Sequence, residues 1–155
     1  MNFNRLASAF SVCLALVALA GCGSSNELPR ASVRGMVLLD GEPLPEGIIR
    51  FVPTGATKGP KSFAEIRVGM FKVDKQYGPI VGTHRIEIIS TDDGGFPEDD
   101  EEAFKRMQEQ GITKIDKITV PAAYNKRSQL TESVTPEGPN DFNFELSSNS
   151  KQKKN

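Results

Sequence analysis

Residues 82–90 read GTHRIEIIS, and this stretch decides the fold class. Successive side chains of a β-strand point to opposite faces of a sheet, and here His84, Ile86 and Ile88 alternate with charged residues. A period of two over several residues is typical of a strand with one buried face in an antiparallel sheet. The stretch therefore predicts a β-strand that turns one face towards a core.

Six further stretches show short alternation or β-branched runs, and each is bounded by turn residues. The chain contains 14 Gly and 10 Pro, which divide it into short segments. This spacing of about seven strands favours an all-β antiparallel sandwich, transthyretin-like or Ig-like. The six further strands are expected over residues 31–39, 48–53, 62–68, 70–73, 129–135 and 140–146, with a turn over 40–47. Expected inward-facing residues in three of them are Val33, Val37 and Leu39; Ala64, Ile66 and Val68; and Phe142, Phe144 and Leu146.

One stretch interrupts the strands. Residues 97–111 read PEDDEEAFKRMQEQG, with a proline at the start and Gly111 at the end, which predicts a helix over about 97–110. Acidic residues near its start complement the helix dipole, and Phe104 and Met107 give a narrow apolar stripe. We expect this helix to be an insertion that lies on the sandwich.

The first 21 residues have the three parts of an export signal. Arg5 is their only charged residue, and the apolar run over 9–20 is shorter than the roughly 20 residues that a spanning helix needs. The tetrapeptide Leu19-Ala20-Gly21-Cys22 resembles the bacterial lipobox, which implies that Cys22 carries a diacylglyceryl group and begins the mature chain. The alternative is an ordinary secretory signal in which Cys22 is incidental. The resemblance and Gly23, which follows in place of Asp, imply the outer membrane over the inner one.

Cleavage before Cys22 removes 21 of the 155 residues and leaves 134, the size of one domain. The mature chain has 18 basic and 20 acidic residues, a balance that gives no support for nucleic-acid binding. Cys13 leaves with the signal, so the domain folds without a disulfide. We expect a lipidated Cys and flexible tether over 22–30, the sandwich over 31–147 and a disordered tail over 148–155.

The segments VRGMV at 33–37, DGEPLP at 40–45 and GIIRFVP at 47–53 form a recognisable pattern. It resembles the start of carboxypeptidase regulatory-like domains, which are small transthyretin-like sandwiches. The chain also resembles short planctomycete-type lipoproteins that carry one such domain. The resemblance covers about residues 31–147. This resemblance implies a structural module without established catalytic residues. The chain departs from the pattern at His84, where a Tyr is usual, and in the acidic helical stretch.

His84 is the single histidine of the chain. It could serve as a base or a metal ligand, but its place on the apolar face of a strand favours a buried, structural role. One histidine does not suffice for the usual zinc sites with two or three His ligands. Hydrolases of the hydroxyisourate type on transthyretin-like folds use several His and Arg residues and a C-terminal motif. This chain has one histidine and does not have the motif.

Asp92 and Asp93 precede two glycines and are the weak candidates for a metal site, because Ca²⁺ prefers oxygen ligands. Their spacing does not match the calcium-loop pattern, which favours a solvated loop. Ser128 lacks the context of a hydrolase nucleophile. Tyr124 and Asn125 could line a binding surface, although securing the chain before the next strand is the stronger interpretation.

These observations predict a non-catalytic, lipid-anchored lipoprotein of the cell envelope, without a cofactor. Its sandwich would be a binding or structural module at the membrane surface, with an envelope protein or a polysaccharide as its partner. The alternatives are a ligand- or calcium-dependent module that binds carbohydrate or peptide and, more weakly, a hydrolase. An enzyme needs convergent titratable groups, and the sequence supplies no such constellation.

Overall fold

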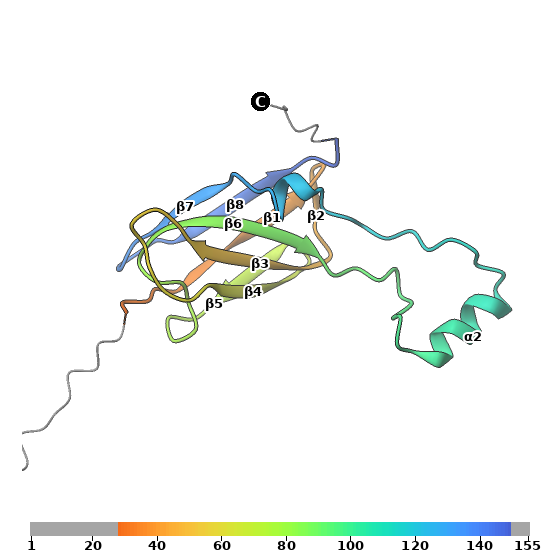
Figure 1. Cartoon of the computed structure of the whole chain (residues 1–155). Helices are drawn as coiled ribbons and strands as arrows, with labels where there is room; N and C mark the ends of the chain where they lie inside the picture. The colour runs from red at the N-terminus through yellow and green to blue at the C-terminus, as the bar shows by residue number, and fades with distance from the viewer. Residues whose placement is uncertain (1–27, 150–155) are drawn as a thin grey trace, which may run out of the picture.

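The strands of the computed structural model, which describes residues 28–149, follow the predicted stretches closely (Figure 1). The signal peptide, Cys22 and the tether up to residue 27 lie outside the described residues, as does the chain from residue 150. In chain order the elements are β1 (Val33–Leu39), β2 (Glu42–Pro43), β3 (Glu46–Pro53), β4 (Ser62–Arg67), β5 (Met70–Val73), β6 (Gly82–Ser90), α2 (Glu101–Glu109), the 3₁₀-helix η2 (Ala122–Tyr124), β7 (Thr131–Val134) and β8 (Asp141–Leu146). The predicted all-β class is confirmed.

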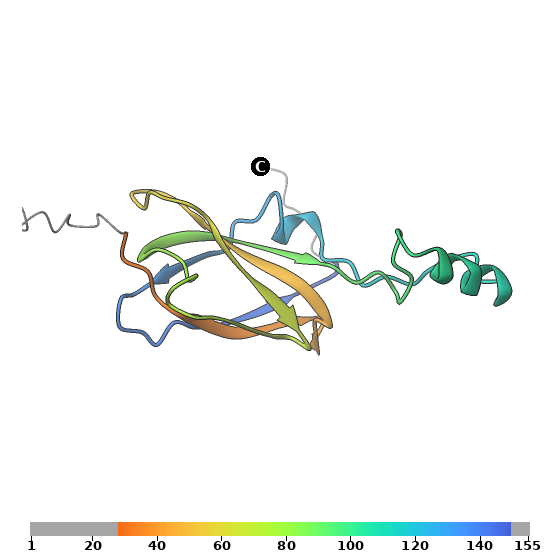
Figure 2. The same cartoon turned by 90° about the horizontal axis from the view of Figure 1, so that it is seen from below.

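One curled sheet contains all eight strands that the structure describes (Figures 1 and 2). Its order is β8-β1-β5-β4-β3-β6-β7, and β2 extends the edge of β1 that β5 also occupies. All pairs are antiparallel except β1 with β8, whose parallel register runs from Arg34 opposite Asp141 to Leu39 opposite Leu146. The sheet is therefore mostly antiparallel, as predicted, and this pair is the exception. No hairpin turn links these two strands, so the sequence pattern did not set their relative direction.

The core lies inside the curl of the sheet and follows the predicted alternation. His84, Ile86 and Ile88 of β6 are fully buried. The Phe51 ring lies about 6 Å from three other rings, with centroid distances of 6.3 Å to Phe71, 6.2 Å to His84 and 6.3 Å to Phe142. Further buried apolar side chains of the strands are Val33, Val37, Ile49, Ala64, Ile66, Val134, Phe144 and Leu146. Leu44, between β2 and β3, is fully buried as well.

Five of the seven predicted strands differ from the structure by one or two residues at one end or both. Val68 was expected to face inward, but it is 74% exposed and has a φ of 50°, because Val68 and Gly69 (φ 76°) form the two-residue turn between β4 and β5. Positive φ at both central residues is the geometry that suits a tight hairpin. The turn predicted over 40–47 contains the short strand β2 and the first residues of β3.

The helix is shorter than predicted, and its position differs. The Asp100 side chain caps α2 by accepting hydrogen bonds from the Glu102 and Ala103 amides, so the helix begins after Asp100 and leaves Pro97 in a preceding turn. Gly111, with a φ of 63°, ends it as predicted. The helix does not lie on the sandwich, because residues 91–118, named the arm below, carry it away from the sheet (Figures 1 and 2).

The fold also extends slightly beyond the predicted ends of the domain. Arg30, assigned to the tether, forms a β-bridge with Ile80. Ser148, assigned to the tail, donates its amide to Asp40 at 3.0 Å. The ordered unit thus begins before residue 31 and continues past residue 147.

Candidate interaction surface

Four chain segments meet at the end of the sheet where the described chain begins. They are residues 28–34, 54–61, 72–83 and 135–141, named the tether end below. Hydrogen bonds join them: the Val81 amide to the Pro29 carbonyl (2.7 Å), the Thr83 amide to Thr57 Oγ1 (2.8 Å) and Asn140 Nδ2 to the Ser32 carbonyl (3.1 Å). A Cβ at Gly78 would lie 1.9 Å from the Ala31 carbonyl oxygen, so only glycine permits this approach. These contacts hold the four segments of the tether end in a defined arrangement.

The tether end is basic. Its four segments contain six basic and three acidic side chains, a net charge of +3. Two of the acidic residues are paired, Asp141 with Arg34 at 3.0 Å and Asp74 with Lys72 at 3.4 Å. Within residues 28–149, no salt bridge engages Lys58, Lys61 or Lys75, and all three are exposed. No sequence pattern marks these lysines as a group, because they come together only through the sheet topology.

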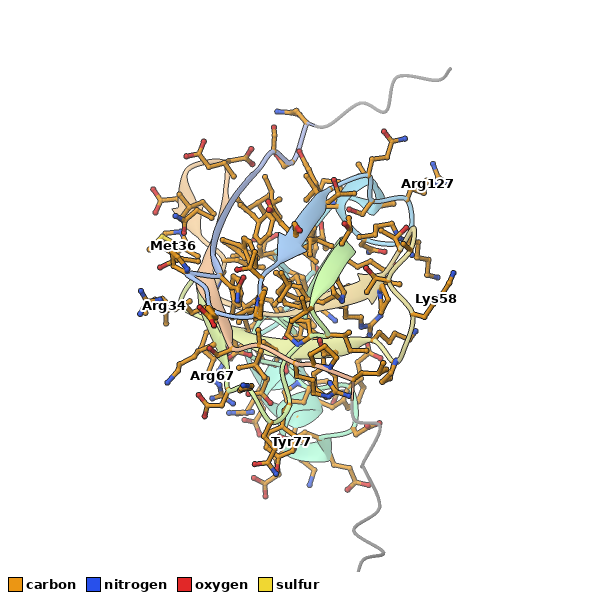
Figure 3. The ribbon with its side chains drawn as sticks, turned by 90° about the vertical axis from the view of Figure 1, so that its left-hand side faces the viewer. Arg34, Met36, Lys58, Arg67, Tyr77 and Arg127 are labelled. Carbon is orange, nitrogen blue, oxygen red and sulfur yellow. The ribbon has the colours of Figure 1, made fainter. Side chains whose placement is uncertain are left out.

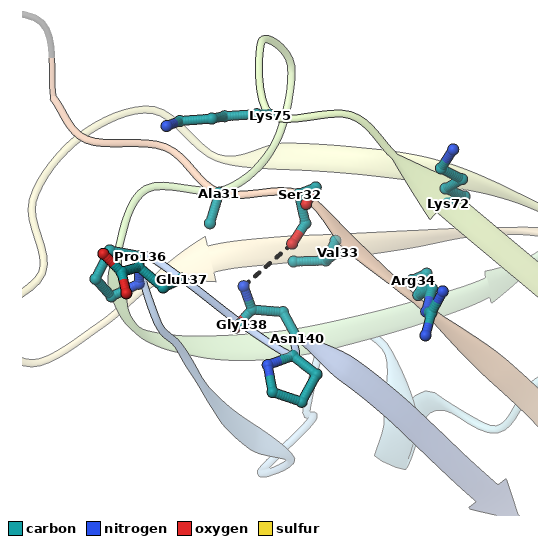
Figure 4. A pocket seen from close by; sticks show the side chains of 11 residues that line it. Ala31, Ser32, Val33, Arg34, Lys72, Lys75, Pro136, Glu137, Gly138 and Asn140 are labelled. Atoms are coloured by element: carbon teal, nitrogen blue, oxygen red, sulfur yellow. Dashed lines mark hydrogen bonds between the residues drawn. The ribbon is translucent and has the colours of Figure 1, made fainter.

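A groove of about 360 Å³ lies at the tether end beside the start of β1. Lys72 and Lys75 lie on one side of it, and Glu137 and Asn140 on the other (Figure 4). Asn140 is committed to the fold, since its amide nitrogen donates to the Ser32 and Thr135 carbonyls and its oxygen accepts from the Thr135 amide. The polar groups left to contact a ligand are therefore the charged side chains of the rim.

Large apolar side chains are exposed on and next to the same end. Tyr77 is 68% exposed in the loop between β5 and β6, Leu28 is 47% exposed, and Phe63 at the start of β4 is 64% exposed. Figure 3 looks onto this end, and there Lys58 and Tyr77 project away from the body of the molecule. The surface thus combines cationic and aromatic groups.

The arm has the opposite charge. Residues 91–118 contain nine acidic and four basic side chains, a net charge of −5. The arm leaves the sheet from the end of β6, opposite the tether end (Figures 1 and 2). Charge is therefore separated along the long axis of the molecule.

Asp92 and Asp93, the weak candidates for a metal site, stabilise the base of the arm. Asp92 Oδ2 accepts from the Ile118 amide at 2.6 Å, and Oδ1 accepts from the Gly94 amide at 2.9 Å. The bond to Ile118 joins the segment that leaves the sheet to the segment that returns to it. These hydrogen bonds lower the pKa of Asp92. Asp93 Oδ1 accepts from the Gly95 amide at 2.8 Å. Nowhere in residues 28–149 do three His, Cys, Asp or Glu side chains gather as a metal site would require.

His84 lies in the core and not in a site. Its Nδ1 donates to the Gly82 carbonyl at 3.0 Å, its ring packs edge-on against Phe51, and the side chain is fully buried. Burial lowers the pKa of His84, against a smaller opposing effect of this hydrogen bond. Its Nε2 has no hydrogen-bond partner among the described residues. The structural role expected for this side chain fits its position.

The polar side chains of Ser128 and Asn125 bind backbone just before β7, and the hydroxyl of Tyr124 binds backbone just after β8. Ser128 Oγ accepts from the Leu130 amide at 3.2 Å, and Asn125 Oδ1 accepts from the Lys126 amide. The Tyr124 hydroxyl accepts from the Ser147 amide at 3.2 Å, which ties η2 to the end of β8. These contacts fit the interpretation that Tyr124 and Asn125 have a structural role.

The fold defines an all-β protein built on one curled, mostly antiparallel sheet. Comparison of the chain with protein-family models, with curated proteins and with solved structures found no match. No helix among residues 28–149 is long and apolar enough to cross a membrane.

Proposed function

We propose that this chain is a non-catalytic lipoprotein of a bacterial cell envelope, held by a lipid on Cys22. Its sandwich would serve as a binding or structural module at the membrane surface, with an envelope protein or polysaccharide as partner. The resemblance to planctomycete-type lipoproteins with a carboxypeptidase regulatory-like domain supports this assignment, as does the lipobox-like stretch before Cys22.

One structural observation carries the proposal: the two ends of the molecule differ. The described chain begins at the basic tether end, a few residues after Cys22, whereas the acidic arm projects from the opposite end. A protein anchored by its start would thus present the arm away from the lipid. The polar side chains that could suggest catalysis are engaged in the fold: Asp92, Ser128 and Tyr124 hold backbone amides, and His84 is buried.

The test compares the native chain with Cys22→Ser in the organism's own envelope. We expect the native chain in the membrane fraction, labelled by radioactive palmitate, and the variant unlabelled and released. Cross-linking in intact cells, followed by mass spectrometry, should then recover a partner that is cross-linked to the arm of the native chain. A native chain that is soluble and unlabelled would refute the anchor, and turnover of an ester or peptide substrate panel by the purified chain would refute the non-catalytic assignment.

A further inference from the structure

The proposed anchor lies close to the tether end along the chain. Cys22 and Leu28 are separated by six residue steps, and a fully extended chain spans at most about 3.6 Å per residue. The Cα of Cys22 is therefore within about 22 Å of the Cα of Leu28. A connection this short keeps the tether end near the headgroups, whatever path the connecting residues take.

The charge of the tether end suits a negative surface. Lys58, Lys61 and Lys75 are exposed and lack salt-bridge partners among residues 28–149, and Arg30 is half-buried with its guanidinium donating to the Gly78 carbonyl at 2.6 Å. Basic side chains near a membrane of anionic lipids attract it over about one Debye length, roughly 8 Å at physiological ionic strength. The arm, with its net negative charge, would be repelled by the same surface if it came within that distance.

The apolar groups are of a kind that membrane interfaces accept. Tyrosine is enriched at the headgroup level, where its ring is buried and its hydroxyl stays hydrated. Tyr77 is exposed two residues after Lys75, and Leu28 lies where the chain leaves towards Cys22. The stems of long basic side chains can cover apolar surface while their charges remain in water.

From these observations we infer that the tether end docks on anionic phospholipid headgroups of the membrane that holds Cys22. Lys58, Lys61 and Lys75 contact the headgroups, and Tyr77 inserts between them. This inference rests on the proposed function, because the lipid anchor brings the surface into reach. Docking fixes the orientation of the sheet and directs the arm away from the bilayer.

The experiment measures how deeply two positions of the lipidated protein lie in the membrane. Gln76→Cys and Gln108→Cys introduce a thiol at exposed sites of the tether end and of α2. In the mature lipidated chain Cys22 is blocked, so each variant has one reactive thiol for an environment-sensitive fluorophore. Each labelled protein is reconstituted in vesicles of phosphatidylcholine alone or with phosphatidylglycerol, and quenching by spin-labelled lipid is compared with quenching by aqueous iodide.

We expect strong lipid quenching at position 76 in the anionic vesicles and little at position 108. The double variant Lys61→Glu, Lys75→Glu should have a ratio of docked to undocked protein that is tenfold lower or more. Each cation near the surface contributes a factor of about five to this ratio. The matched control, Lys105→Glu with Lys114→Glu on the arm, changes the same number of charges and should leave the ratio unchanged. High salt should reproduce the loss.

The outcomes separate the docking from the anchor. Membrane-bound protein with equal quenching at both positions overturns the docking alone. Position 76 shielded from iodide but not quenched by lipid also overturns it, and points to a protein covering the tether end. A chain that never enters the membrane fraction overturns the anchor, and the docking with it.

Discussion

Phe51 and Phe104 have the same side chain, but it is buried in one region and exposed in the other. Phe51 in β3 is fully buried among three rings, whereas Phe104 on α2 is 61% exposed. The sheet is held by contacts between residues far apart in sequence. Helix α2 is capped by residues next to it, and the arm closes at its base through the hydrogen bond between Asp92 and the Ile118 amide. The comparison teaches that alternation in a strand reports burial, while a short apolar stripe on a helix does not show what the helix packs against.

The largest test of this difference removes each ring in turn. Phe51→Ala should lower the free energy of unfolding by about 3–5 kcal/mol, because it leaves a cavity in the core. Phe104→Ala should change it by less than about 0.5 kcal/mol, as is usual for surface positions. Urea unfolding followed by circular dichroism measures both. A comparable loss for the two variants would show that the helix packs on the sheet in solution.

The buried histidine gives the sheet a pH dependence that the arm does not share. The folded-state pKa of His84 lies below the unfolded value of about 6.5, so the unfolded chain binds the proton more readily. The stability that His84 contributes is therefore present above pH 6.5. It is lost as the pH falls below that value, by about 1.4 kcal/mol per pH unit, until the folded-state pKa is reached.

His84→Phe provides the control for this dependence, because its ring cannot take up a proton. Urea unfolding between pH 5 and pH 8 should show a slope for the native chain and a flatter profile for the variant. An identical slope in the two proteins would assign the pH dependence to a group other than His84.

A smaller and local effect is expected at the base of the arm. Asp92→Ala removes the acceptor for the Ile118 and Gly94 amides, which should open the arm without unfolding the sheet. Limited proteolysis should cut residues 91–118 several-fold faster, with unchanged unfolding of the sheet. The same opening should occur on acidification, because the pKa of Asp92 is lowered: its contribution is present above about pH 3.9 and lost as the pH falls through the folded-state pKa. Asp93→Ala, which loses only the bond to Gly95, should have a weaker effect, and equal cutting would contradict the assigned role of Asp92.

The smallest effects are expected at two turns. Val68→Asn should raise sheet stability by about 1 kcal/mol, because Asn tolerates positive φ better than a β-branched residue. Gly111→Ala should weaken α2 by a similar amount, about 1 kcal/mol, through the same backbone constraint. Hydrogen exchange reads the two sites separately. If Val68→Asn leaves the stability of the sheet unchanged, the paired strands already compensate for the backbone strain at position 68.

Much of the sheet could be predicted because its signal is local in sequence. His84, Ile86 and Ile88 are buried as their alternation indicates, and Phe144 and Leu146 likewise. Val68 continues the alternation of β4 in the sequence, yet it lies in a turn, because Gly69 permits the hairpin to close one residue earlier.

Other features depend on partners far away in the chain. The parallel direction of β8 is set by β1, more than 100 residues before it, and no short pattern encodes this pairing. The cationic surface likewise gathers Lys58 and Lys75 from two separate loops. The lipidation of Cys22 remains a prediction from sequence, because that residue lies outside the described part of the chain.

The parallel pairing of β1 and β8 also has a mechanical consequence. A pulling force between the tether and the chain after Leu146 would act on the start of one strand and on the end of its neighbour. The strands would have to slide past each other, so the hydrogen bonds between them would be loaded together in shear instead of parting one at a time. Loads transmitted through the two ends of the chain would thus meet a mechanical clamp before they reached the rest of the sheet.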